Sequence, residues 1–231
     1  MITRNKPTKI VQDFILGKRN LEDTVNRLSN KIEKSIIKEC ERAINMRKNK
    51  TALVVVDMQN DFITGALGSL EAEAIIEPAA DYIKNFQGCL IYETRDFHKV
   101  EDYRDSVEGR RIPIHCVLDK KGYDTEERIS DAIREKRAKV DHYVFMKNTF
   151  GSIDFAQSVA RDVKNLEIEK IVLIGLCTDI CVISNALMLR AACPNTRIVV
   201  LEDLCAGSNP ENHYAALRVL RANCIDVEKA F

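Results

Sequence analysis

Hydrophobic residues recur every three or four positions along residues 20–48, and charged residues fill most positions between them. The recurring side chains are Leu21, Val25, Leu28, Ile32, Ile36, Cys40 and Ile44. This spacing predicts one amphipathic helix, with Asn20 as its N-cap. The apolar seam permits either a coiled coil or packing on the rest of the chain. A short helix is also predicted near residues 9–16, and residues 47–50 are typical of a linker.

From residue 51 onward, short apolar runs alternate with amphipathic stretches. The apolar runs predict strands at residues 52–56, 89–93, 142–146, 170–174, 197–201 and 224–227. The amphipathic stretches predict helices at residues 71–86, 125–138, 154–166, 180–192 and 210–222. Several strands are continuous β-branched runs, as in strands buried on both faces of a parallel sheet. We therefore expect an open α/β sheet with helices on both faces over residues 51–231, preceded by a helical extension over residues 1–50.

The composition narrows the class of protein. The chain has 231 residues, of which 45% are apolar and 30% charged, and this balance suits one or two globular domains. No apolar run approaches the length of a membrane span. Residues 1–9 lack the apolar segment and cleavage site of a secretory signal, so we expect a cytoplasmic protein. The eight cysteines are too scattered for a disulfide framework, and most are interpreted as small buried residues.

Charge is unevenly distributed although the net charge is zero. Residues 1–50 carry 13 Lys+Arg and 6 Asp+Glu, a net charge of +7 that the remaining residues balance. A basic segment of this kind can bind nucleic acid. We favour a solvated helix face, or an arm that docks on an acidic body, so a nucleic-acid partner is not expected.

Reactive side chains follow four of the predicted strands. Asp57 follows the first strand, the second runs into Asp96 and His98, Lys147 follows the third, and Cys181 comes shortly after the fourth. The carboxyl ends of parallel strands share one edge of a sheet, where open α/β folds bind their ligands. We therefore expect an acid, an acid–imidazole pair, an amine and a thiol at one rim.

Cys181 is the candidate nucleophile at this rim. Thr178 or Asp179 is expected to cap the following helix, which places Cys181 in the first turn, where the helix dipole favours a thiolate. The aspartate could take the thiol proton, the lysine could stabilise anions, and the preceding turn could direct N–H groups at an oxyanion. An inert buried cysteine, or a redox pair with Cys177, is the alternative.

Asp96, His98 and His115 form a second candidate site. An Asp-x-His pair in an extended loop can present both side chains to one ion, and His115 could complete the set. Nitrogen and oxygen ligands without a thiolate suit zinc, iron(II) or manganese. The alternative is a surface loop held by hydrogen bonds.

An aromatic residue and two further histidines have other expected roles. Phe62 follows the first strand and could stack on a flat ligand or fold into the core. His142, at the start of a strand, and His213, within a helix, are interpreted as structural. No phosphate-binding loop or dinucleotide fingerprint occurs in the sequence.

Five segments of the chain, in this order, resemble the nicotinamidase branch of the isochorismatase-like cysteine hydrolases. They are Val56-Asp57-Met58-Gln59-Asn60-Asp61-Phe62, Arg95-Asp96-Phe97-His98, Pro113-Ile114-His115-Cys116, Lys147-Asn148-Thr149-Phe150-Gly151-Ser152 and Gly175-Leu176-Cys177-Thr178-Asp179-Ile180-Cys181-Val182. The resemblance covers about residues 51–231. The Asp-x-His pair together with the His-Cys pair indicates nicotinamidases, because isochorismatases and several amidase relatives lack that metal set.

The resemblance implies a catalytic triad of Asp57, Lys147 and Cys181, and a sheet in the order 3-2-1-4-5-6. It implies an oxyanion hole formed by the amides of Cys177 and Cys181, with a cis peptide between Leu176 and Cys177. Cys181 would attack the carboxamide of nicotinamide, release ammonia and form a thioester that water hydrolyses to nicotinic acid. Such a reaction belongs to NAD salvage.

The resemblance also implies that Asp96, His98 and His115 bind a divalent metal, with zinc first and iron or manganese as alternatives. The metal and its waters would hold the pyridine nitrogen of the substrate. Two departures bear on that substrate. Ile112 stands where many members have tryptophan, and Leu118-Asp119-Lys120 stands where many have a Gly-Thr pair.

These departures leave two alternatives open. The first is a related cysteine amidohydrolase acting on another small amide, such as a ureido acid or maleamate. The second is a binding or scaffold protein that uses the basic N-terminal helix. Residues 1–50 have no counterpart in the family, and we expect a homo-oligomer built partly on the helix at residues 20–48.

Overall fold

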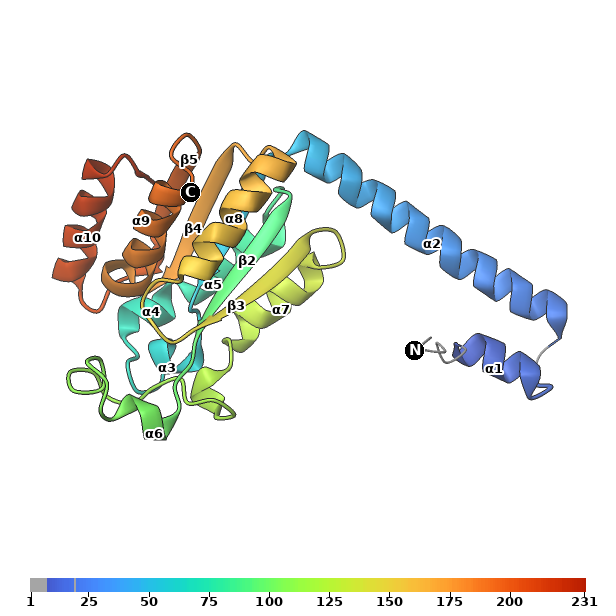
Figure 1. Cartoon of the computed structure of the whole chain (residues 1–231), viewed down its shortest axis with the longest axis horizontal. Helices are drawn as coiled ribbons and strands as arrows, with labels where there is room; N and C mark the ends of the chain where they lie inside the picture. Colours follow the sequence, from blue (N-terminus) through green and yellow to red (C-terminus); the bar gives the residue numbers. More distant parts are fainter. Residues whose placement is uncertain (1–7, 19) are drawn as a thin grey trace. The chain divides into compact units, whose positions relative to one another are not determined.

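The computed structural model describes residues 8–18 and 20–231, which form two compact units, one up to Ile44 and one from Asn45 to Phe231 (Figure 1). The strands are β1 Thr51–Val56, β2 Leu90–Asp96, β3 Asp141–Lys147, β4 Lys170–Leu176, β5 Arg197–Ala206 and β6 Asp226–Glu228. All neighbouring strands pair in parallel, in the order β3-β2-β1-β4-β5-β6. The expected fold class and sheet order are therefore confirmed.

Two helices precede the first strand, and helices and shorter helical turns connect the later strands. They are α1 Lys9–Ile15, α2 Leu21–Lys48, α3 Asn60–Ile63, α4 Leu70–Ala74, α5 Ile76–Asn85, α6 Val100–Tyr103, η1 Lys121–Tyr123, α7 Glu127–Lys136, α8 Ile153–Leu166, η2 Thr178–Val182, α9 Ile183–Ala192 and α10 Pro210–Ala222. Among the described residues, no helix is both long and apolar enough to cross a lipid bilayer.

The helix predicted at residues 20–48 is confirmed as α2. The side chain of Asn20 accepts a hydrogen bond from the amide of Asp23 at 2.7 Å, as an N-cap does. Apolar side chains of the predicted seam are about half exposed in the single chain. Their exposed fractions are 62% for Leu21, 50% for Val25, 59% for Ile32, 54% for Ile36 and 52% for Ile44.

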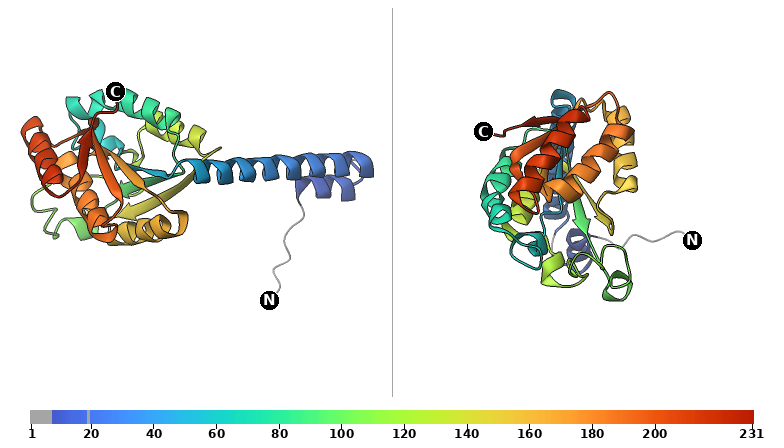
Figure 2. Two further views of the ribbon diagram at one scale, coloured as in Figure 1. Left: turned by 90° about the horizontal axis from the view of Figure 1, so that it is seen from above. Right: turned by 90° about the vertical axis from the view of Figure 1, so that its left-hand side faces the viewer.

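Alternate residues of each central strand face two separate cores. On β1, Leu53 and Val55 pack in the core beneath α4, α5 and α7, whereas Val54 and Val56 pack in the core beneath α8, α9 and α10. Figure 2 shows these two groups of helices on opposite sides of the sheet. This two-sided burial explains the continuous β-branched runs. The two edge strands differ: Tyr143 and Val144 of β3 stay exposed, and no residue of β6 is buried.

Two predicted helices differ from the structure at their first turns. The helix predicted at residues 71–86 is divided at Ile75 into α4 and α5. Pro78 explains the break, because its ring would clash with the carbonyl four residues earlier in a continuous helix. The helix predicted at residues 180–192 begins with η2, a π-helical turn, before α9.

A buried carboxylate joins β2 to its surroundings. Glu93 accepts hydrogen bonds from Arg95 at 2.6 Å and from the Thr125 hydroxyl at 2.5 Å, and contacts Nε2 of His142 at 2.9 Å. His142 is thus structural, as expected. Burial raises the pKa of Glu93, but the bonds from His142, Arg95 and Thr125 outweigh it and hold the pKa at about 2.

We expect Glu93→Gln to lose about 3 kcal/mol of unfolding free energy at pH 7, because a pKa held below its ordinary value of 4.5 stabilises the fold. That contribution is complete above pH 4.5 and disappears as the pH falls toward 2. Urea unfolding of both proteins at several pH values measures it. Glu73→Gln, on an exposed face of α4, should change stability by less than about 0.5 kcal/mol. A Glu93→Gln penalty that does not shrink in acid would contradict the linkage.

Candidate active site

The strand register places the carboxyl ends of β1, β2, β3 and β4 next to one another at one edge of the sheet. Val56 at the end of β1 pairs with Thr94 of β2 and with Gly175 of β4, and Asp96 of β2 pairs directly with Lys147 of β3. Side chains at paired positions of parallel strands point to the same face. The residues that follow these positions therefore meet at one edge of the sheet, as predicted.

Asp57, Lys147 and Cys181 are in mutual contact at this edge. Nζ of Lys147 lies 2.6 Å from Oδ2 of Asp57 and 3.5 Å from Sγ of Cys181. Oδ1 of Asp57 accepts a hydrogen bond from the Thr94 hydroxyl at 2.7 Å. The three residues are 0%, 4% and 3% exposed, respectively. The structure thus brings the expected acid, amine and thiol together in a cluster that is almost fully buried.

The backbone around this cluster has unusual conformations. Asp57 has φ 47°, a left-handed conformation that non-glycine residues rarely adopt and that concentrates at functional sites. Gly175 has φ 125°, and a Cβ there would lie 2.1 Å from the carbonyl oxygen of Val56. Only glycine therefore lets the end of β4 approach β1 this closely. The peptide between Leu176 and Cys177 is cis.

The sequence predicts a thiolate at Cys181, and the surroundings of Cys181 in the structure do not favour one. Burial raises the pKa of the Cys181 thiol well above its ordinary value, because Lys147 only partly offsets desolvation and the negative charges of Asp57 and Asp96 oppose it further. Burial also raises the pKa of Asp57, against the lowering effect of Lys147. The pKa of Lys147 is raised, because its acidic and thiol neighbours outweigh burial. Burial thus favours the protonated thiol of Cys181 over a thiolate.

The expected helix cap is also wrong. Cys177 occupies the N-cap position, and no side chain caps the turn. Thr178 instead bonds through Oγ1 to Nδ1 of His213 at 2.9 Å, and the carboxylate of Asp179 accepts bonds from the amide and hydroxyl of Ser208. These contacts tie the turn that carries the nucleophile to the segment that begins α10. His213 is therefore structural, as expected.

The expected metal ligands converge beside this cluster. Oδ2 of Asp96 lies 3.1 Å from Nε2 of His98 and 3.1 Å from Nε2 of His115. Glu108 joins them, with Oε1 at 3.7 Å and 3.6 Å from the same two nitrogens. Ligand atoms of all four residues lie within 4.8 Å of one another. Glu108 was not predicted from the sequence, because it lies in a loop where neither periodicity nor spacing marks it.

The four side chains fit a divalent metal. Oδ1 of Asp96 and Oε1 of Glu108 are buried and accept no hydrogen bond from the described residues. Their charged neighbours stand off at longer distances, with Nζ of Lys147 at 3.7 Å from Oδ1 of Asp96 and the two imidazoles at 3.7 Å and 3.6 Å from Oε1 of Glu108. Buried carboxylate oxygens without hydrogen bonds are costly, and a cation would stabilise both. Two imidazoles and two carboxylates suit zinc, iron(II) or manganese.

Neighbouring groups fix the ligands in place. Nδ1 of His115 lies 2.9 Å from the carbonyl of Pro113, so that donation to this carbonyl leaves Nε2 directed at the cluster. Gln59 is fully buried and holds both backbone groups of Asp96, accepting from its amide at 2.7 Å and donating to its carbonyl at 2.8 Å. Gln59 also bonds the carbonyl of Tyr123. It therefore links the segment between β1 and α3 to the end of β2 and to η1.

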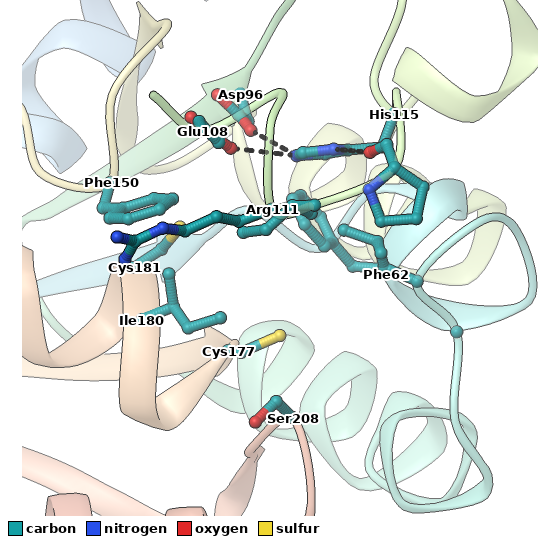
Figure 3. A pocket seen from close by; sticks show the side chains of 14 residues that line it. Phe62, Asp96, Glu108, Arg111, His115, Phe150, Cys177, Ile180, Cys181 and Ser208 are labelled. Carbon is teal, nitrogen blue, oxygen red and sulfur yellow. Dashed lines mark hydrogen bonds and ion pairs between the residues drawn. The ribbon is translucent and has the colours of Figure 1, made fainter. Parts of the chain in front are cut away.

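A pocket of about 310 Å³ opens onto both clusters (Figure 3). Cys181 and Cys177 line one side, and His115 and Phe62 line the other. The rings of Phe62 and His115 meet edge to face with centroids 5.2 Å apart. The volume suits a small ligand, and Phe62 is placed where a flat ligand would meet it.

The model of the Isochorismatase domain matches residues 51–230. The match covers the whole parallel sheet and all the strand-end residues described above. The chain therefore belongs to the isochorismatase family.

Several relatives within the family are nicotinamidases or pyrazinamidases. An isochorismatase family protein, PncA of Bacillus subtilis, is 28% identical over 73% of this chain and 92% of its own length. The crystal structure of nicotinamidase PncA from Bacillus subtilis is 27% identical, covers 78% of this chain and 99% of its own, and has a TM-score of 0.66. The pyrazinamidase of Pyrococcus horikoshii in complex with zinc is 26% identical over 78% and 99% of the two chains, with a TM-score of 0.61.

A further solved structure comes from another amidase. N-carbamoylsarcosine amidase from Thermoplasma acidophilum is 29% identical over 78% of this chain and 95% of its own, with a TM-score of 0.61. The relatives together place this chain among the amidohydrolases of the family, on the nicotinamidase branch.

Proposed function

We propose that the protein deamidates nicotinamide to nicotinic acid and ammonia through a thioester on Cys181, with a metal bound beside the nucleophile. The observation that carries the proposal is that the Asp57–Lys147–Cys181 cluster and a metal-ligand set meet at one pocket. Cys181 of the first cluster lines this pocket together with Asp96, Glu108 and His115 of the second. The nicotinamidase relatives support the substrate. We place the reaction in NAD salvage in the cytoplasm.

The chemistry begins from a neutral thiol. As Sγ of Cys181 bonds to the carboxamide carbon, its proton passes to Asp57, and Lys147 offsets the negative charge of the cluster. Amides of Cys177 and Cys181 receive the oxyanion. The proton then goes to the amide nitrogen, the C–N bond breaks and ammonia leaves. Water attacks the thioester, the C–S bond breaks, and the thiol returns with release of the acid.

Asp96, His98, Glu108 and His115 would hold the metal. Bound there, the ion would supply a Lewis acid that orients the pyridine nitrogen. Zinc is our first candidate, from the donor set and from the zinc complex of the related pyrazinamidase.

We expect purified protein to bind one divalent ion per chain and to release ammonia from nicotinamide. Dialysis against a chelator should lower kcat/KM, and zinc, manganese or iron(II) should restore it. Glu108→Gln should weaken metal affinity about 10- to 100-fold, because it replaces a negatively charged ligand with a neutral amide. Glu101→Gln, exposed on α6 in the same connection, is the control. Full activity in metal-free protein would contradict metal dependence, and activity only on other amides would contradict the substrate.

We also propose that α2 pairs with α2 of a second copy. The helix has 28 residues and exposes a stripe of apolar side chains, among them Ile32 and Ile36, that a second helix would bury. A solvated helix of this kind gains most of its stability from packing.

We expect light scattering to give the mass of two chains for the wild type and of one chain for the double variant Ile32→Asp, Ile36→Asp. A charge at these positions would be buried in the paired helices. Leu70→Asp, at an 80% exposed position on α4, should leave the mass unchanged. A wild-type chain that is monomeric at all concentrations would contradict the pairing.

A further inference from the structure

Asn185 is a fully buried polar residue on α9, four positions after Cys181. Burying a side-chain amide is costly unless its oxygen and both of its N–H groups find partners. Oδ1 of Asn185 accepts a hydrogen bond from the amide of Ser152 at 3.0 Å. Nδ2 donates to the carbonyl of Cys181 at 2.8 Å and to the carbonyl of Phe150 at 3.2 Å. The side chain is therefore bonded to backbone groups at three points.

The partners of Asn185 belong to two different segments. The carbonyl of Cys181 lies in η2, the turn that carries the nucleophile. Phe150 and Ser152 lie in the connection between β3, which ends at Lys147, and α8. One side chain thus joins the segment of the thiol to the segment that directly follows the ammonium, whose Nζ lies 3.5 Å from Sγ.

The surrounding contacts hold η2 at both of its ends. At its start, the side chains of Thr178 and Asp179 bond to residues at the beginning of α10. At its end, α9 lies directly against the connection after β3. A Cβ at Gly151 would lie 2.8 Å from Sδ of Met188 and 3.2 Å from Cβ of Ser184, both on α9. The three bonds of the asparagine fasten the turn to the connection at this contact.

We propose that Asn185 is a positioning residue, which holds Cys181 at the distance from Lys147 that nucleophilic attack requires. The reaction itself rests on the proposed function of Cys181. Asn185 does not line the pocket, so it acts through the two segments that it joins and not on the substrate. A displacement of about 1 Å between reacting groups can cost about 100-fold in rate, and so one buried side chain of this kind can control turnover.

Asn185→Ala is expected to lower kcat for nicotinamide about 10- to 100-fold and to change KM by less than about threefold, because the attack is impaired and binding is not. Calorimetry should then show one nicotinate bound per chain with wild-type affinity. A variant that had merely unfolded in part would bind less than one. Asn185→Leu keeps the branched shape of the side chain and removes the same three bonds, so it should behave in the same way.

Ser184→Ala is the matched control. The hydroxyl of Ser184 donates to the carbonyl of Ile180 at 2.6 Å, a bond that stays within η2 and α9. Its removal loosens the same helical segment without releasing the connection after β3. We therefore expect kcat and KM of Ser184→Ala to stay close to those of the wild type.

Alkylation of Cys181 by iodoacetamide tests the positioning without any amide substrate. The thiolate is the reactive form. Burial raises the pKa of this thiol and the charge of Lys147 lowers it, while Asp57 and Asp96 raise it further. Moving the sulfur away from the ammonium should slow alkylation at pH 8 about 3- to 10-fold. A thiol that had only become more exposed would react faster.

Mass spectrometry with fragmentation follows the label on Cys181 separately from that on Cys177. Slower alkylation in Asn185→Ala and Asn185→Leu, but not in Ser184→Ala, supports the positioning role even if the wild type hydrolyses no nicotinamide. Alkylation of Cys181 in both Asn185 variants that is as fast as in the wild type, or faster, would overturn it. An unchanged kcat in these variants would do the same.

Discussion

Cys181→Ala is expected to lower ammonia release from nicotinamide by about 10⁴-fold or more, the loss typical of removing a nucleophile. Sγ of Cys181 lies within 3.5 Å of Nζ of Lys147, and the variant removes the atom that would bond to the carboxamide carbon. The fold should survive, since alanine fits the site and a small cavity costs about 1–2 kcal/mol. Steady-state ammonia assays and urea unfolding measure the two effects separately.

Cys205→Ala is the matched control. Cys205 is buried like Cys181, and burial raises its thiol pKa to about 12. It packs in the core and does not line the pocket. Its replacement should cost similar stability and leave kcat/KM nearly unchanged. A Cys181→Ala protein that keeps about a tenth of wild-type activity would contradict nucleophilic catalysis by this thiol.

Lys147→Met is expected to damage both activity and stability. Its ammonium neutralises the fully buried carboxylate of Asp57 at 2.6 Å, and removing one partner of a buried pair costs about 3–5 kcal/mol. Activity should fall about 10²- to 10⁴-fold, because Asp57 loses the charge that keeps it ionised as the proton acceptor. Without Lys147, burial raises the pKa of Asp57 unopposed, so the stability loss should shrink as the pH falls and the acid becomes neutral.

The double variant Asp57→Asn, Lys147→Met separates the two effects. It buries no unpaired charge, so we expect it to recover most of the stability lost in Lys147→Met and none of the activity. Lys84→Met is the control, because Lys84 pairs with Asp81 at 3.9 Å on the surface and should contribute less than about 1 kcal/mol. If the double variant unfolds as easily as Lys147→Met, the buried pair is not the cause of the instability.

The parts of the site that follow strand ends were predictable from the sequence. Asp57, Asp96 and Lys147 each end or follow a strand, and parallel register brings such positions together regardless of the connections. The alternation of buried residues on β1 likewise follows from two covered faces. These features follow from the hydrophobic periodicity of the sequence together with a general rule for parallel sheets.

Other features depend on contacts between distant segments. Glu108 belongs to the irregular connection between α6 and His115, whose path is set by turn hydrogen bonds rather than by a repeating pattern. The protonation of Cys181 depends on burial by several elements at once, and so the sequence-based expectation of a thiolate was wrong. The predicted helix cap was wrong for a similar reason. Thr178 and Asp179, the candidate caps, form hydrogen bonds with His213 and Ser208 instead.

The most direct measurement is to trap the acyl-enzyme. Protein mixed with nicotinamide and quenched in acid within the first turnovers is digested, and the peptides are examined by mass spectrometry. We expect one nicotinoyl group per chain, on the peptide that holds Cys181, lost on treatment with hydroxylamine and absent in Cys181→Ala. Ammonia released in a full first turnover with no adduct on any cysteine, or with the adduct on Cys177 alone, would contradict the proposed chemistry.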